Sequence, residues 1–119
     1  MTTQQIADRL VYLCRQEKHP QAQAELYDVN IESFEDDKLG IPPTKGMEAI
    51  KQKVKDWDAS VIEIHNASVS DPIVTGNYFA VTMENDITFV DRGRVQIKEI
   101  CLYEVKKGKI IRERFFYDL

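Results

Sequence analysis

The sequence is poor in glycine, proline and cysteine, with five, four and two residues of these types among 119. So few turn residues, together with 43% hydrophobic residues, exclude a low-complexity or disordered chain. Cys14 and Cys101 form no disulfide framework, and neither cysteine lies in a metal-ligand spacing. We expect both to be small buried hydrophobic residues, with a disulfide between them as the less favoured alternative.

A long apolar run is also missing, since no stretch approaches the roughly 18 residues that a membrane-spanning helix requires. The polar residues 1–5 do not resemble the start of a secretory signal. Positive charge is not in excess either, because the net charge is -4, whereas nucleic-acid-binding proteins commonly carry a basic face. The composition therefore predicts a cytoplasmic protein with no membrane or nucleic-acid partner, and its length predicts one domain over residues 1–119.

The most informative stretch is residues 95–117, where apolar and polar residues alternate. Alternate residues of a strand share one face, and here the first such set is Val95, Ile97, Glu99, Cys101, Tyr103 and Val105. After a turn at Lys107-Gly108, the return strand offers a second set, namely Ile111, Glu113, Phe115 and Tyr117. A carboxylate on an apolar face must be paired, neutralised or next to a water-filled cavity. Two such acids on adjacent strands therefore predict a cavity.

Three helices are predicted in the first half of the chain. Apolar residues recur at helical intervals over residues 3–18. A shorter helix is expected over residues 20–27, because Pro20 suits the first helical position. The third helix follows Gly46 and carries a buried stripe that reaches Trp57.

Strands make up the remainder. A short strand over residues 29–35 ends at Glu35, and a proline-containing loop over residues 36–45 follows it. We expect this loop to border the mouth of the pocket, because it directly follows Glu35 and long loops often lie at functional sites. Four further strands form a meander, over residues 61–70, 78–90, 95–105 and 111–117. Helices first and strands later predict an α+β fold with an antiparallel sheet.

Several segments have a familiar arrangement: Leu26-Tyr27, residues 31–35, residues 46–50, Trp57, residues 63–65, residues 79–81, Glu99, residues 103–110 and residues 115–117. In these segments the chain resembles the SnoaL-like branch of the nuclear-transport-factor-two-like superfamily, which also holds ketosteroid isomerases and limonene epoxide hydrolases. The resemblance implies a cone, in which a strongly curved antiparallel sheet wraps on three N-terminal helices around a pocket. It also implies a homodimer.

The resemblance suggests roles for particular residues. Glu35 falls where ketosteroid isomerases keep their carboxylate base. Near their oxyanion-binding aspartate this chain has Cys101, with Glu99 two residues earlier on the same face. Near their helix-one tyrosine it has Val11, with Tyr12 next to it.

We predict a small-molecule ligand and three candidate catalytic residues. Glu35 or Glu99 is expected to move the proton, because burial raises the pKa of a carboxyl group towards neutral pH. His65 is expected to assist, because histidine titrates near pH 7. We expect His65 to lie close to Glu99. The candidate substrate-binding residues are Tyr12, Trp57, Cys101, Glu113, Phe115 and Tyr117. The sequence has no phosphate-binding loop, zinc cluster or nucleophile elbow, so we predict neither a cofactor nor a metal.

The predicted reaction is an isomerase, cyclase or hydratase reaction on a small apolar or polyketide-like molecule. A non-catalytic ligand-binding module and a dimerisation module with a vestigial pocket are the alternatives. Each acid also has a structural interpretation, such as an ion pair between Glu113 and a flanking arginine. Ile100 and Leu102 alternate onto the face opposite Glu99, and they predict a dimer through the last strands.

Overall fold

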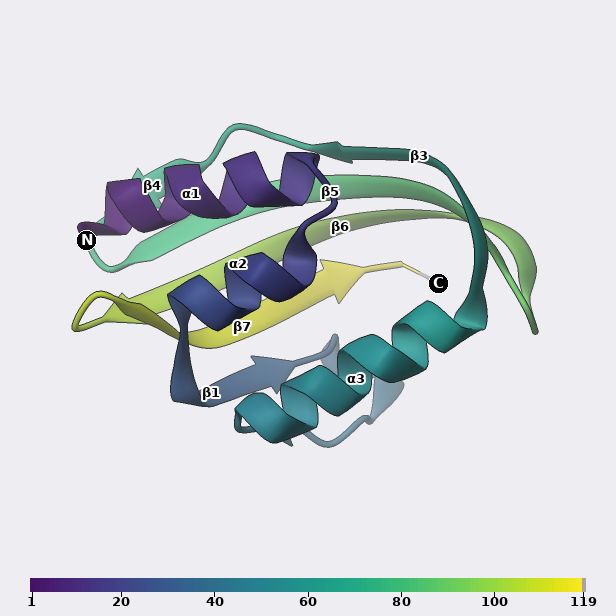
Figure 1. Cartoon of the computed structure of the whole chain (residues 1–119), viewed down its shortest axis with the longest axis horizontal. Helices are drawn as coiled ribbons and strands as arrows, with labels where there is room; N and C mark the ends of the chain where they lie inside the picture. The colour runs from purple at the N-terminus through teal and green to yellow at the C-terminus, as the bar shows by residue number, and fades with distance from the viewer. Residues whose placement is uncertain (119) are drawn as a thin grey trace.

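The computed structural model describes residues 1–118 (Figure 1). Its helices are α1 (Thr3–Arg15), α2 (His19–Leu26) and α3 (Met47–Ser60), with one turn of 3-10 helix at Asp37–Leu39. Its strands are β1 (Tyr27–Phe34), β2 (Thr44–Lys45), β3 (Val61–Val69), β4 (Ile73–Thr75), β5 (Tyr78–Phe89), β6 (Gly93–Lys106) and β7 (Lys109–Tyr117). The predicted α+β fold, with three helices and a four-stranded meander, is confirmed.

Helix α1 ends earlier than the sequence pattern predicted. The amides of Gln16 and Lys18 both donate to the carbonyl of Leu13, and Glu17 adopts a left-handed backbone with φ 58°. These bonds satisfy carbonyls of the last turn and reverse the chain direction. Helix α2 also ends one position early, because Tyr27 has extended backbone and begins β1.

The strands form a single sheet in the order β2-β1-β7-β6-β5-β3, with β4 paired to β5. One pair departs from the predicted antiparallel arrangement, since β1 and β7 run parallel. Parallel strands require a long connection, and here nearly the whole chain between them supplies it. The pairing therefore leaves no local signal in the sequence. Strands β2 and β4 were also not predicted, because two or three residues are too short to show a period.

Helix α3 connects the two edges of this sheet. It packs on β1 and β2 at one edge and on β3 at the other, whereas α1 packs on β3, β4 and β5. Figure 1 shows the long strands bending together, with α1 and α3 lying apart on the side towards which the sheet curves. This arrangement confirms the predicted curved sheet with three helices.

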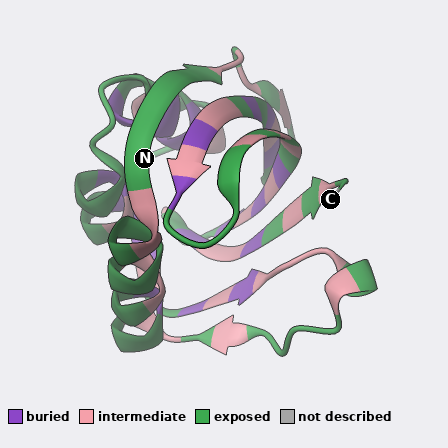
Figure 2. Ribbon diagram, turned by 90° about the vertical axis from the view of Figure 1, so that its right-hand side faces the viewer, coloured by how far each residue is buried: buried purple, intermediate pink, exposed green. Residues whose placement is uncertain are grey.

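The face of β6 that carries Glu99 points inward, as the alternation predicts. Cys101, Tyr103 and Val105 are buried, and the rings of Tyr103 and Phe79 stack with their centroids 4.7 Å apart. Buried and exposed residues alternate along the strands (Figure 2). Both Cys14 and Cys101 are buried and free, as expected.

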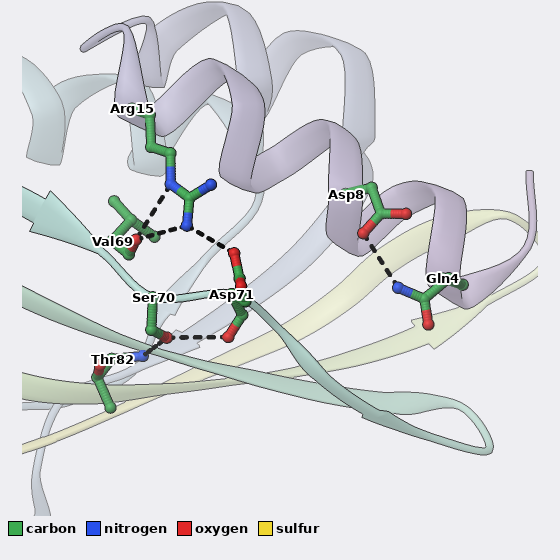
Figure 3. A network of polar contacts seen from close by, with 7 residues as sticks. All are labelled: Gln4, Asp8, Arg15, Val69, Ser70, Asp71 and Thr82. Atoms are coloured by element: carbon green, nitrogen blue, oxygen red, sulfur yellow. Dashed lines mark hydrogen bonds and ion pairs between the residues drawn. The ribbon is translucent and has the colours of Figure 1, made fainter.

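Polar contacts of Arg15 hold α1 against the connection between β3 and β4 (Figure 3). The Arg15 guanidinium donates to the carbonyl of Val69 over 2.9 and 3.1 Å and forms a 2.9 Å ion pair with Asp71. Next to it, the Ser70 hydroxyl accepts a 2.8 Å hydrogen bond from the amide of Thr82 on β5. No helix within residues 1–118 is long and apolar enough to cross a membrane.

Candidate functional site

Three glutamates meet on the inner face of the sheet. Glu99 lies directly opposite Tyr117 in the β6–β7 pairing, and Glu113 lies opposite Ser33 in the β1–β7 pairing. Glu35 follows the last residue of β1. The charges of Glu35 and Glu113 both raise the pKa of Glu99, which shows that the three groups share one electrostatic environment. The two acids predicted on adjacent strands therefore do lie together, and a third joins them.

Glu113 is the most deeply buried of the three, with 3% of its surface exposed. Burial raises its pKa, and hydrogen bonds from the hydroxyls of Tyr27 and Ser33 oppose that rise. Because the carboxyl group is enclosed and already has donors, it is placed to support its neighbours rather than to meet a ligand. Burial also raises the pKa of Tyr27 well above its usual value, so this phenol remains a donor.

Lys53 of α3 is the cation of the site. It forms an ion pair with Glu35 and donates a 3.1 Å hydrogen bond to Ser33 Oγ. Its ammonium lies 5.3 Å from the centre of the Phe115 ring, within the range of a cation–π contact. The sequence analysis missed Lys53. Its spacing from Ile50 and Trp57 places it on their helix face, and that spacing is the signal that would have identified it.

Glu35 has a second partner in addition to Lys53. The hydroxyl of Tyr117 donates a 2.8 Å hydrogen bond to Glu35 Oε2. The loop after β1 is anchored nearby, because Asp36 accepts a 3.2 Å hydrogen bond from the amide of Tyr117. Beyond it, Lys38 forms a 3.0 Å ion pair with Asp118. The 36–45 loop thus begins beside the end of β7, on the Glu35 side of the site, as expected.

Glu99 differs from the other two acids. Burial, with a contribution from the Glu35 charge, raises its pKa to about 7. Within residues 1–118 it forms no ion pair, although the thiol of Cys101 on the same strand face is close enough to hydrogen-bond to it. A carboxyl group that titrates near neutral pH can accept or donate a proton under ordinary conditions.

An open hollow of about 460 Å³ lies at this end of the sheet. The hollow lies where both faces of the sheet meet solvent. Its inner-face residues are Met83, Glu99 and Tyr117, and its outer-face residues are Thr82, Glu84, Lys98, Ile100 and Phe116, with Asp36, Lys38 and Asp118 beside them. A mixed apolar and polar lining is typical of small-molecule sites. Glu99 therefore has a route to a bound molecule. Within the residues described, no group of three or more His, Cys, Asp or Glu side chains is arranged to hold a metal ion.

His65 is not part of this cluster. Its Nε2 lies 2.7 Å from Thr88 Oγ1, whereas Glu99 pairs with Met83 on the same strand, β5. Thr88 and Met83 are an odd number of positions apart, and the β5–β6 register is continuous between them, so their side chains point to opposite faces. The predicted proximity of His65 to Glu99 is therefore wrong.

The predicted ligand-binding residues are distributed unevenly. Tyr12 lies on the outer surface of α1, 56% exposed and against Arg9, so its predicted place in the pocket is wrong. Trp57 packs edge-on against Phe89, with ring centroids 5.3 Å apart, one helical turn beyond Lys53. Phe115 and Tyr117 lie among the acids, since Phe115 contacts Lys53 and Tyr117 donates to Glu35.

Cys101 lies opposite Phe115 on the inner face and is fully buried. Burial, together with the charge of Glu99, raises the pKa of its thiol well above the usual range. A thiol held protonated in this way is a weak nucleophile. Cys101 therefore lies in the core next to Glu99 and outside the lining of the hollow.

Comparisons with known proteins identify the family and the fold. Residues 1–117 match a family described as the SnoaL-like domain. A candidate SnoaL-like polyketide cyclase from Mesorhizobium loti is 34% identical, with a TM-score of 0.90 over 98% of this chain and 100% of that one. A candidate isomerase from Bacillus subtilis is 19% identical, with a TM-score of 0.71 over 99% of this chain and 90% of that one.

A nuclear-transport-factor-two-like protein of unknown function from Burkholderia pseudomallei has the same fold. It is 14% identical, with a TM-score of 0.78 over 99% of this chain and 92% of that one. No functionally curated protein matches the sequence.

Proposed function

The chain belongs to the SnoaL-like domain family, and on this basis we propose that it is an acid–base enzyme with Glu99 as its proton carrier. The proposed reaction is an isomerisation or cyclisation of a small, largely apolar carbonyl compound, polyketide-like in character. The similarity to the Mesorhizobium loti protein supports this reaction class. The observation that carries the proposal is the position of the Glu99 carboxyl group, which borders an open hollow and whose burial raises its pKa to about 7.

The proposed chemistry begins with the ionised form of Glu99. It removes a proton from the carbon next to a substrate carbonyl and becomes a carboxylic acid, and the substrate becomes an enolate. In an isomerisation, Glu99 returns the proton to a different carbon. In a cyclisation, the enolate carbon attacks a second carbonyl and the proton goes to the resulting alkoxide. A base with a pKa near the working pH performs both half-steps efficiently.

The other two acids have supporting roles in this proposal. Glu35 is held by Lys53 and Tyr117, and Glu113 by Tyr27 and Ser33. Their negative charge raises the pKa of Glu99 and so makes it a stronger base. The division of roles follows from the environment of each carboxyl group, since the three side chains are chemically identical.

The test uses 5-nitrobenzisoxazole, a small aromatic probe whose single carbon-bound proton is removed in one step to release a coloured phenolate. We expect turnover above the buffer rate, with a pH profile that rises through about pH 7. Glu99→Gln is expected to abolish this profile. Glu84→Gln is the matched control, because Glu84 lines the same hollow but points to the other face of the sheet. Equal turnover by wild type and Glu99→Gln would exclude Glu99 as the base.

A non-catalytic binding module is the second candidate function. It is favoured by the fact that two of the three acids already have hydrogen-bonding partners in the cluster. Such a module would bind 5-nitrobenzisoxazole without turnover, so the same assay distinguishes it. We also propose a homodimer through the outer face of β6 and β7, where Ile100 and Phe116 are cross-strand neighbours and 51% and 45% exposed.

A further inference from the structure

A second polar cluster lies on the outer face of the sheet, where β3, β5 and β6 run side by side. It consists of Glu63 and His65 from β3, Asp86 and Thr88 from β5, and Arg94 from β6. The proposed proton-transfer chemistry uses none of these residues. The central strand, β5, is paired on both sides along this segment, and the pairing with β3 shifts register on either side of Glu63 and His65.

His65 connects a carboxylate to a hydroxyl. Its Nδ1 lies 2.8 Å from Glu63 Oε2, and its Nε2 lies 2.7 Å from Thr88 Oγ1. A carboxylate accepts hydrogen bonds but cannot donate them, so its closeness favours the tautomer that carries the proton on Nδ1. In the neutral imidazole, Nε2 then has a free lone pair and accepts the hydrogen bond of the threonine hydroxyl. The sequence of acid, imidazole and hydroxyl is that of an activated nucleophile.

Arg94 adds a positive charge next to the hydroxyl. It is the direct cross-strand partner of Thr88, and cross-strand partners have their Cβ atoms about 4.5–5.5 Å apart. Its Nε and Nη2 donate to Asp86 over 2.9 and 2.8 Å. Because a guanidinium has five N–H donors, others remain available to stabilise negative charge on an oxygen atom beside Thr88.

The site is partly accessible, since the side chains of Arg94 and His65 are 62% and 23% exposed and Thr88 is half-buried. We propose that Glu63, His65 and Thr88 form a second reactive site, which takes the acyl group of an activated ester. Thr88 is its nucleophile and His65 its general base. Glu63 is a positioning residue that acts through the imidazole, and Arg94 supplies the oxyanion contact.

The proposed ester hydrolysis needs only Thr88, His65, the ester and water. Thr88 Oγ1 attacks the ester carbonyl carbon, and the hydroxyl proton passes to His65 Nε2. The bond between the acyl carbon and the alcohol oxygen then breaks, and the departing oxygen takes the proton from His65. Water, activated by the same imidazole, attacks the acyl-Thr88 ester and releases a carboxylic acid and free Thr88. The net reaction is the hydrolysis of one ester.

The test uses p-nitrophenyl acetate as the probe on the intact chain. Release of p-nitrophenolate is followed by absorbance, and the acetyl group is located by mass spectrometry of the proteolysed protein. The variants are Thr88→Val, which keeps the shape of the side chain, and His65→Gln. Thr75→Val is the matched control, because Thr75 lies on β4 of the same sheet, outside the lining of the hollow, and has no histidine partner. Thermal unfolding confirms that each variant is folded.

We expect wild type to carry acetyl groups on Thr88. His65→Gln should lower the rate constant of Thr88 acylation by about 100-fold or more, the usual contribution of a general base. Thr88→Val should carry no acetyl group at position 88. Thr75→Val should behave like wild type. The proposal is overturned if Thr88→Val releases p-nitrophenolate as fast as wild type, or if wild type is acetylated only at other positions. A result of either kind leaves the Glu99 proposal untouched, because the two sites lie on opposite faces of the sheet.

Discussion

The hydroxyl of Tyr117 donates a 2.8 Å hydrogen bond to Glu35, and the same residue lies directly opposite Glu99 on the neighbouring strand. One phenol thus stands between the two acids that the sequence offered as proton carriers. Glu35 has both this donor and the ammonium of Lys53, whereas Glu99 has neither. The structure therefore distinguishes the two candidate proton carriers. Glu35 is bound by a cation and a phenol, whereas Glu99 has neither partner.

The difference in stability between wild type and Glu99→Gln should depend on pH. The folded-state pKa of Glu99 is about 7, against an ordinary value of 4.5, so the folded protein holds this proton more tightly than the unfolded chain does. The stability of wild type therefore falls as pH rises from 4.5 through 7, and the glutamine variant escapes this loss. At pH 8 we expect the variant to be about 1–3 kcal/mol more stable, because one pKa unit corresponds to about 1.4 kcal/mol.

Urea unfolding of wild type and Glu99→Gln at pH 5 and pH 8 measures this difference, with the exposed Glu84→Gln as the control. The gain should be largely absent at pH 5, where Glu99 is protonated in the folded protein. A glutamine variant that is several kcal/mol less stable than wild type at pH 8 would mean that the Glu99 charge has a structural partner.

Removing the cation of the site should destabilise the protein. Lys53→Met leaves the carboxylate of Glu35 without its ammonium partner, and the hydroxyl of Ser33 loses a donor. Because Lys53 is partly exposed to water, we expect a loss of about 1–3 kcal/mol rather than the larger cost of a fully buried pair. Urea unfolding at pH 7.5 measures it. The control, Lys51→Met on the same helix, breaks only an exposed contact with Glu48 and should change stability little.

Two tyrosine-to-phenylalanine variants should lose stability in proportion to the burial of the carboxyl group that each tyrosine contacts. Tyr27→Phe removes a donor from the fully enclosed Glu113 carboxyl group and should cost about 1–3 kcal/mol, because water cannot replace the lost hydrogen bond. Tyr117→Phe removes a donor from Glu35, which is closer to solvent and retains Lys53, so its cost should be smaller. Equal losses of stability in thermal unfolding would show that the burial of the two carboxyl groups does not determine what each hydrogen bond contributes.

The proposed dimer can be tested by placing a charge in its interface. Ile100→Lys is expected to convert a dimer into a monomer in light scattering at micromolar concentration, because an unpaired ammonium is costly to bury. Ile73→Lys is the matched control, since Ile73 is 77% exposed but lies on the short strand β4 outside the proposed interface. A wild type that is monomeric, or an Ile100→Lys variant that remains dimeric, contradicts this interface.

The alternation of residues along β6 and β7 predicted the inward acids correctly because a strand has a strict period of two. It failed where the strands are irregular. A shift in the pairing between Glu104 and Val105 places Ile110 rather than Ile111 in the core. A local pattern carries no trace of such a shift, because the shift is defined only by the partner strand.

The composition of the site was harder to predict than the fold. The faces of β3 and β6 are related only through β5, so the sequence of either strand could not show that His65 and Glu99 point in opposite directions. Lys53 was overlooked because a lysine on a partly polar helix resembles a solvated residue. Its long apolar stem allows the ammonium to reach across the ring of Phe115 to the acids.

The pKa of Glu99 in the folded protein tests the central claim most directly. Carboxyl carbons of glutamate can be followed by NMR as pH is varied, and the Glu99 signal is assigned as the one lost in Glu99→Gln. The account predicts a midpoint near pH 7 for this signal. A midpoint near the ordinary glutamate value of 4.5 would show that Glu99 is solvated and ionised at neutral pH, and would contradict its role as the proton carrier.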